Sequence, residues 1–122
     1  MIIAVDFDGT LHTGIYPNIG EPAKDAARCL HKLHKDGHTI ILWTCRTGEH
    51  LAAAINWLKD QDIPFDRVND NDPKNIQEYN CNTRKIYADV YIDDKQVGGL
   101  PSWIEILKLV DPEYELYNGF PG

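Results

Sequence analysis

The sequence lacks a surplus of basic residues. Its 122 residues include 12 Lys and Arg against 19 Asp and Glu, which gives a formal charge of −7 at pH 7. A generic nucleic-acid-binding protein neutralises phosphates with a basic face, and anionic membranes likewise attract basic segments. We therefore expect no membrane association and no nucleic-acid-binding face, and nucleic acid stays a candidate only as a substrate.

Long apolar runs and paired cysteines are also missing. No stretch approaches the ~20 apolar residues of a membrane span, and residues 1–5 lead into Asp6 without the basic start and apolar core of a signal peptide. Cys29, Cys45 and Cys81 are odd in number and widely spaced, which argues against a disulfide framework or a structural zinc site. These features predict a cytoplasmic location.

The length and composition are typical of one folded domain. Apolar residues make up 43% of the chain and charged residues 25%, and one domain usually takes roughly 100–200 residues. We expect residues 1–122 to form a single domain. Within it, Gly and Pro residues indicate a short flap at about 9–20, and the tail at about 112–122 has no strong periodicity.

Strand-like and helix-like segments alternate along the chain. Apolar runs predict strands at 2–5, 39–43, 64–68 and 88–92. Helical spacing of apolar residues predicts helices at 22–36, 49–60 and 101–110. Residues 69–82 have the composition of a loop, with room for at most a turn or two of helix. This order predicts an α/β fold, in which a single Rossmann-like parallel sheet is sandwiched by helices.

Acidic residues follow two of the predicted strands. Asp6 and Asp8 come after the first strand, and Asp93 and Asp94 after the last. Ligands of parallel sheets bind at the carboxyl ends of the strands, so these residues converge on one edge. Four carboxylates gathered there repel one another, and a divalent cation relieves the repulsion. A few oxygen ligands suit Mg²⁺, which keeps several waters and binds substrate phosphate.

Four short motifs occur in order along this alternating pattern. Asp6-Phe7-Asp8-Gly9-Thr10 reads DxDGT, Thr44 ends an apolar strand, Lys85 precedes the last strand, and Asp93-Asp94 follows it. In these motifs the sequence resembles the haloacid dehalogenase superfamily of phosphohydrolases. The resemblance implies a phosphatase fold of this type and gives each motif a role.

The implied catalytic residues are Asp6, Asp8 and Lys85. Asp6 would take the phosphoryl group as an aspartyl-phosphate. Asp8 would protonate the leaving group and then deprotonate the attacking water. Lys85 would offset charge between Asp6 and the phosphoryl oxygens. The neighbouring Arg84 is the alternative cation, although the spacing to the last strand favours Lys85.

The resemblance also implies a Mg²⁺ site. Its ligands would be the carboxylates of Asp6 and Asp93, the backbone carbonyl of Asp8, and Asp94 either directly or through water.

Phosphate-binding groups would come from Gly9, Thr44, Cys45 and Arg46. Thr44 would donate its hydroxyl and nearby backbone N–H groups to phosphate oxygens, and Gly9 would permit the turn after Asp8. The Cys45 thiol is expected to face away from Thr44 and pack. Arg46 can bind a phosphate through two parallel hydrogen bonds from its guanidinium, or it can be a surface side chain of a loop.

Two histidines have open roles at this stage. His12 in the flap and His50 at the start of the second helix are candidates for contact with substrate, and the sequence does not assign either of them a role.

The chain is too short for the cap domain that most proteins of this superfamily carry. About a dozen residues separate DxDGT from the first helix, so we expect no cap domain. An uncapped site accepts a small phosphorylated molecule or a large substrate such as a phosphorylated polymer end, or a neighbouring subunit of a homo-oligomer covers it.

The expected function is therefore Mg²⁺-dependent hydrolysis of phosphomonoesters through an aspartyl-phosphate on Asp6. Two alternatives remain. One is a receiver-like signalling module that keeps its aspartyl-phosphate, and the other directs the same hydrolysis to nucleotides or nucleic-acid ends.

Overall fold

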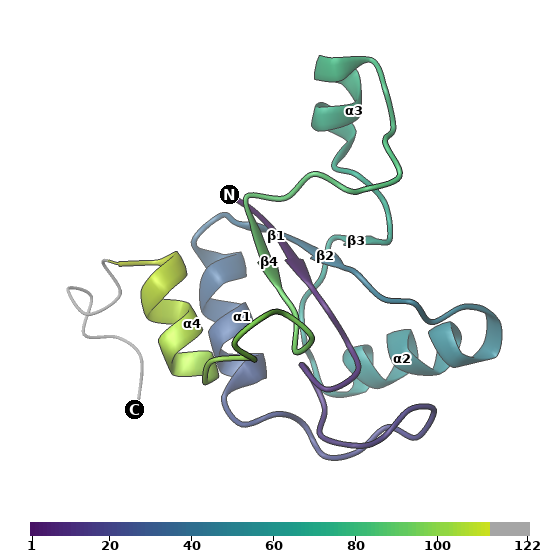
Figure 1. Ribbon diagram of the computed structural model, residues 1–122, viewed down its shortest axis with the longest axis vertical. Coiled ribbons are helices and arrows are strands. Elements are labelled where there is room, and N and C mark those ends of the chain that lie inside the picture. Colours follow the sequence, from purple (N-terminus) through teal and green to yellow (C-terminus); the bar gives the residue numbers. More distant parts are fainter. Residues whose placement is uncertain (113–122) are drawn as a thin grey trace.

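Four parallel strands form the centre of the computed structural model, which describes residues 1–112 (Figure 1). The strands lie in the order β3-β2-β1-β4. Their bounds are β1 Ile2–Val5, β2 Thr39–Leu42, β3 Arg67–Val68 and β4 Val90–Ile92. The single parallel α/β sheet expected from the alternating pattern is confirmed. The tail expected at 112–122 lies outside the described residues, apart from its first residue.

Within residues 1–112, four helices connect and follow the strands. They are α1 Ala26–Lys35, α2 Gly48–Asp60, α3 Pro73–Tyr79 and α4 Trp103–Val110. The short α3 lies within the segment where we expected a loop with a turn or two of helix. None of the helices in residues 1–112 has the length and apolar character needed to cross a membrane.

Helix α1 begins at Ala26 rather than at the expected Pro22. The reason is that residues 22–23 are held extended against the flap. The backbone N–H of Ala23 donates to the carbonyl of Leu11 at 2.8 Å, and Pro22 forms an isolated β-bridge with His12.

The helices flank the sheet unequally. Alternate strand residues such as Ile3, Val5 and Leu42 join one large buried cluster with the apolar sides of α1, α2 and α4. On the other face, Ala4 and Ile41 pack against Ile86, Ala88 and their neighbours. None of the residues of α3 is buried, and Figure 1 shows α3 standing away from the sheet. The expected sandwich is therefore well developed on one face only.

The register of the central strands brings distant residues to one edge. Val5 of β1 pairs with Ile92 of β4, and the N–H of Asp6 donates to the carbonyl of Ile92 at 2.9 Å. Asp6 and Asp93 consequently leave the sheet side by side. On the other side of β1, the N–H of Trp43 donates to the carbonyl of Val5 at 2.8 Å, which places residue 44 at the same edge.

Candidate metal and phosphate site

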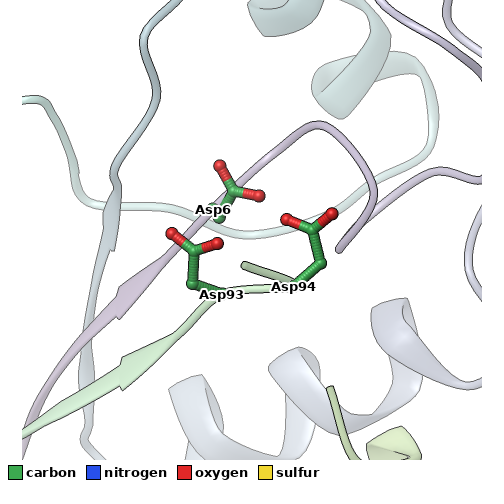
Figure 2. A group of neighbouring side chains, drawn as sticks. All are labelled: Asp6, Asp93 and Asp94. Atoms are coloured by element: carbon green, nitrogen blue, oxygen red, sulfur yellow. The ribbon is translucent and has the colours of Figure 1, made fainter. Parts of the chain in front are cut away.

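Three carboxylates meet where β1 and β4 end. Asp6, Asp93 and Asp94 each offer an oxygen, and these oxygens lie within 4.8 Å of one another. Figure 2 shows the three side chains directed toward a common space from two adjacent strands. The structure thus brings together three of the four acidic residues that the sequence singled out. The fourth, Asp8, is not part of this group, and its side chain lines the adjoining pocket.

The electrostatics of this acidic triad (Asp6, Asp93 and Asp94) favour a cation. Burial, followed by the charge of Asp93, raises the pKa of Asp6 from 3.8 to about 7, although a hydrogen bond from Thr10 opposes the rise. The Oδ1 atom of Asp94 is buried and has no hydrogen-bond partner among the described residues. A buried carboxylate oxygen without a partner is costly. Oxygen-only ligands in this number fit Mg²⁺, which Asp6, Asp93 and Asp94 would hold.

The turn after Asp8 is built around the triad. Gly9 has φ +80°, and a Cβ atom there would lie 2.3 Å from Oδ2 of Asp94, so a side chain at this position would displace the carboxylate. The buried Thr10 hydroxyl donates to Oδ2 of Asp6 at 3.0 Å and accepts from the N–H of Asp94 at 3.1 Å. The last two residues of DxDGT therefore shape the acidic triad from within, a role that the motif alone did not assign to Thr10.

We expect Mg²⁺ to stabilise the protein more at high pH than at low pH. The folded pKa of Asp6 lies above its unfolded value of 3.8, so its contribution to stability is full below 3.8 and is lost as the pH rises through about 7. Mg²⁺ binds the ionised form, so the shift in melting temperature that Mg²⁺ produces should be small at pH 5 and large at pH 8. Thermal unfolding with and without Mg²⁺ at the two pH values measures this.

The matched variants are Asp94→Asn and Asp60→Asn, since Asp60 is an exposed acid at the end of α2. The first should lose the Mg²⁺ shift and the second should keep it. Equal shifts at pH 5 and pH 8 in the wild-type protein would contradict the account.

A pocket of about 470 Å³ lies beside the acidic triad. Its lining residues are Asp6, Asp8, Tyr16, Thr44, Cys45, Arg46, Asp93, Asp94 and Lys95. The sequence indicated all of these except Tyr16, which comes from the flap, and Lys95, which directly follows the acidic pair. The adjacency of Lys95 to Asp93-Asp94 was a signal that could have identified it.

Thr44 is held in place by a side chain that the sequence did not indicate. Asn69 accepts from the N–H of Thr44 and donates to its carbonyl, both at 2.8 Å. The Thr44 hydroxyl accepts from the N–H of Arg46 at 3.2 Å, so its own proton remains for an acceptor in the pocket. Thr44 is accordingly well placed to donate to a phosphate oxygen.

Cys45 is exposed and lines the pocket, so the expectation that its thiol packs is wrong. The physical reason is that β2 ends at Leu42, after which the alternation of a strand no longer sets the direction of side chains.

Arg46 is not a surface side chain, and its guanidinium is not available for a bidentate contact with phosphate. It is 2% exposed, and its guanidinium donates to both oxygens of Asp8, from Nε at 2.9 Å and from Nη2 at 2.7 Å. It also donates to the carbonyls of Pro17 at 3.0 Å and His50 at 3.1 Å. The bidentate contact expected with a phosphate is therefore made with Asp8.

Asp8 is surrounded by donors. Burial favours a higher pKa for Asp8, but the hydrogen bonds from Arg46 and His12 outweigh it and hold the pKa below its ordinary value. His12 is fully buried, bonds to Oδ1 of Asp8 at 2.8 Å and does not line the pocket, so the structure does not bring this candidate to a position where it would contact a substrate. The ring of His50 packs edge-on against Tyr16, 5.4 Å between centroids, and His50 does not line the pocket.

The structure does not bring Lys85 to the pocket. Its ammonium lies over the ring of Tyr91, 5.3 Å from the centroid. Neither Lys85 nor Arg84 is among the lining residues, whereas Lys95 is. The catalytic role of Lys85 stays a prediction, and Lys95 is the lysine whose position suits contact with a bound phosphate.

No protein-family model and no curated protein matches the sequence. A solved structure of a conserved protein coded by a locus of Bacteroides thetaiotaomicron is similar. It is 37% identical in sequence, and the match covers 100% of this chain and 98% of that chain, with a TM-score of 0.83. The similarity therefore spans the whole sheet and both acidic strand ends.

Proposed function

We propose that this chain, which belongs to the same family as the conserved Bacteroides thetaiotaomicron protein, is a Mg²⁺-dependent phosphomonoester hydrolase that forms an aspartyl-phosphate on Asp6. One observation carries the proposal. The carboxylate oxygens of Asp6, Asp93 and Asp94 lie within 4.8 Å of one another, beside a pocket that Thr44 and Lys95 also line. Phosphoryl transfer needs positioning and neutralisation of charge, and this arrangement offers both.

The first step is attack by Asp6 on phosphorus. A bond forms between a carboxylate oxygen and phosphorus, and the bond from phosphorus to the ester oxygen breaks. Asp8 gives a proton to the departing oxygen. Thr44 and Lys95 orient and neutralise the other phosphoryl oxygens, and Mg²⁺, when bound, supplies further positive charge at the phosphoryl group.

The second step is hydrolysis of the aspartyl-phosphate. Asp8 takes a proton from water, the water oxygen bonds to phosphorus, and the carboxylate of Asp6 is released. The lowered pKa of Asp8 suits this step directly, because a carboxylate is the form that accepts a proton. The same lowered pKa makes the protonated form scarce for the first step, so we expect esters with good leaving groups to react faster.

The test of this proposal is hydrolysis of phosphomonoesters by the wild-type protein. Aryl phosphates, phosphorylated metabolites, nucleotides and end-phosphorylated oligonucleotides are assayed with Mg²⁺ and with a chelator. Mg²⁺-dependent release of phosphate supports the proposal, and its absence with every ester contradicts it. The panel also separates a nucleotide or nucleic-acid-end phosphatase from one that acts on small metabolites.

The receiver-like alternative differs in the lifetime of the phosphorylated protein. A signalling module that stores its phosphoryl group has no use for a general base. The pocket of this protein contains Asp8, a carboxylate that can act as one, which favours hydrolysis. A phosphorylated state that persists for minutes would favour the signalling module.

The two lysines give a prediction of their own. We expect Lys95→Ala to raise KM for an aryl phosphate by about fivefold, because an exposed charge contact contributes modestly. Lys85→Ala, the matched control, should leave KM near the wild-type value because Lys85 lies over Tyr91. Steady-state kinetics of the two variants measure this. The reverse pattern, with Lys85→Ala the more damaging, would restore the role that the third motif implies.

A further inference from the structure

We infer that His12 is a positioning residue that fixes which oxygen of Asp8 handles the proton. The inference rests on the proposed function and deepens it. His12 is fully buried, with its ring 4.7 Å from that of Phe7 and 6.1 Å from that of Trp57 between centroids. Packed in this way, the imidazole has a fixed orientation and presents one nitrogen to Asp8.

The hydrogen bonds of His12 define its tautomer. Two backbone N–H groups point at Nδ1, from Gly14 at 3.0 Å and from Gly20 at 3.2 Å. A backbone N–H can only donate, so Nδ1 acts as the acceptor and carries no proton. The ring proton therefore sits on Nε2, from which it is donated to Oδ1 of Asp8 at 2.8 Å.

One lone pair of the Asp8 carboxylate accepts no hydrogen bond from the described residues. Each carboxylate oxygen has two lone pairs. Oδ1 accepts from Nε2 of His12 and from Nη2 of Arg46, so both of its positions are filled. Oδ2 accepts only from Nε of Arg46 among the described residues. Its second lone pair is the place where Asp8 can receive a proton and from which it can deliver one.

His12 also connects Asp8 with Gly14 and Gly20, the two flap residues that come close together. A Cβ atom on Gly14 would lie 2.4 Å from the backbone nitrogen of Gly20, so the two glycines close the loop that carries Tyr16. Tyr16 lines the pocket. His12 thus connects the part of the flap that borders the pocket with the residue that transfers the proton.

Two substitutions separate the bond of His12 to Asp8 from its two bonds to the flap. Asn at this position can place its side-chain oxygen where Nδ1 lies and keep the bonds from Gly14 and Gly20, but it cannot reach Asp8. Gln can place its side-chain amide where Nε2 lies and keep the bond to Asp8, but it loses the flap contacts. A purely structural histidine would make the two variants lose activity in the same way with all substrates.

The readout is dependence on the leaving group. An alkyl phosphate needs a proton from Asp8, whereas p-nitrophenyl phosphate leaves readily without one. Without His12, Oδ1 of Asp8 is open to the proton as well as Oδ2, and this loss of position opposes the rise in the pKa of Asp8 that follows from losing the bond. We expect the loss of position to prevail, so that His12→Asn lowers kcat/KM about tenfold more for the alkyl than for the aryl ester. His12→Gln should keep the wild-type ratio of the two values. An unchanged ratio in His12→Asn, or an equal change in both variants, would overturn the inference. If His12→Asn does not fold, the position of the ring proton in the wild-type protein decides, because the inference requires it on Nε2.

A nitrogen-15 spectrum of the wild-type imidazole tests the inference independently of activity. The expected result is a proton on Nε2 of His12 and none on Nδ1, and a proton on Nδ1 would overturn it. If the wild-type protein hydrolyses neither ester, the proposed function fails while the spectrum still decides the placement of the His12 proton.

Discussion

Replacing Asp6 by Asn is expected to abolish hydrolysis of an aryl phosphate, with a fall in kcat of about a thousandfold or more. The amide cannot attack phosphorus, and in the proposed mechanism the other carboxylates of the pocket have other roles. Asp93 and Asp94 would hold the cation with Asp6, and Asp8 would transfer the proton. The measurement is release of the aryl alcohol at saturating Mg²⁺. Turnover at the wild-type rate would exclude the aspartyl-phosphate mechanism.

Thermal unfolding of Asp6→Asn without metal provides the control. Burial and the charge of Asp93 raise the pKa of Asp6 to about 7, so the ionised carboxylate is unfavourable in the folded protein at pH 8. Asn removes that charge. The variant should therefore be at least as stable as the wild-type protein at pH 8, and loss of activity cannot then be attributed to unfolding.

Replacing Arg46 by Met is expected to have the largest effect on stability. The guanidinium is 2% exposed and makes hydrogen bonds to Asp8, Pro17 and His50. Removing one partner of a buried ion pair costs about 3–5 kcal/mol, and the partial exposure of Asp8 places this case at the low end, about 3 kcal/mol. Chemical denaturation measures the free energy of unfolding.

The double variant Arg46→Met with Asp8→Asn separates the charge from the packing. Much of the cost arises from leaving the carboxylate of Asp8 without its cation, so neutralising Asp8 should restore part of the lost stability. Arg46→Met unfolding at the wild-type denaturant concentration, or a double variant less stable than Arg46→Met, would contradict the role given to this pair.

The edge of the sheet that carries the site was predictable from the sequence. Apolar runs that end in Asp6 and in Asp93 indicated buried parallel strands, and parallel strands present their carboxyl ends on one side. The structure bears this out, because the register Val5 to Ile92 places Asp6 and Asp93 side by side. The apolar runs of the chain therefore predicted the strands, and the parallel arrangement of those strands predicted that Asp6 and Asp93 lie close together.

The partners of Asp8 were not predictable in the same way. Arg46 and His12 lie in loops, where no period indicates whether a side chain turns inward. Gly14 and Gly20 gave a partial signal, since their lack of side chains allows two backbone amides to reach one nitrogen of His12. Recognising that contact requires the path of the flap, which only the three-dimensional structure supplies.

Lys85 shows a further limit of motif spacing. The segment that contains it has no regular structure, and its neighbours Ile86 and Ala88 are buried against the face of the sheet opposite α1 and α4. Their burial fixes the path of the segment, and the Lys85 ammonium comes to lie over Tyr91. Distance along the chain to β4 carries no information about that path.

Direct detection of the phosphorylated carboxylate tests the central claim most closely. The wild-type protein is mixed with an aryl phosphate and Mg²⁺, quenched in acid within one turnover, and digested for mass spectrometry. We predict a phosphoryl group on the peptide that contains Asp6, and none in Asp6→Asn. In the wild-type protein this phosphoryl group should disappear when the quench is delayed until the ester is consumed. A phosphoryl group on any other residue, or hydrolysis of the ester with no phosphorylated protein at any time, would contradict the account.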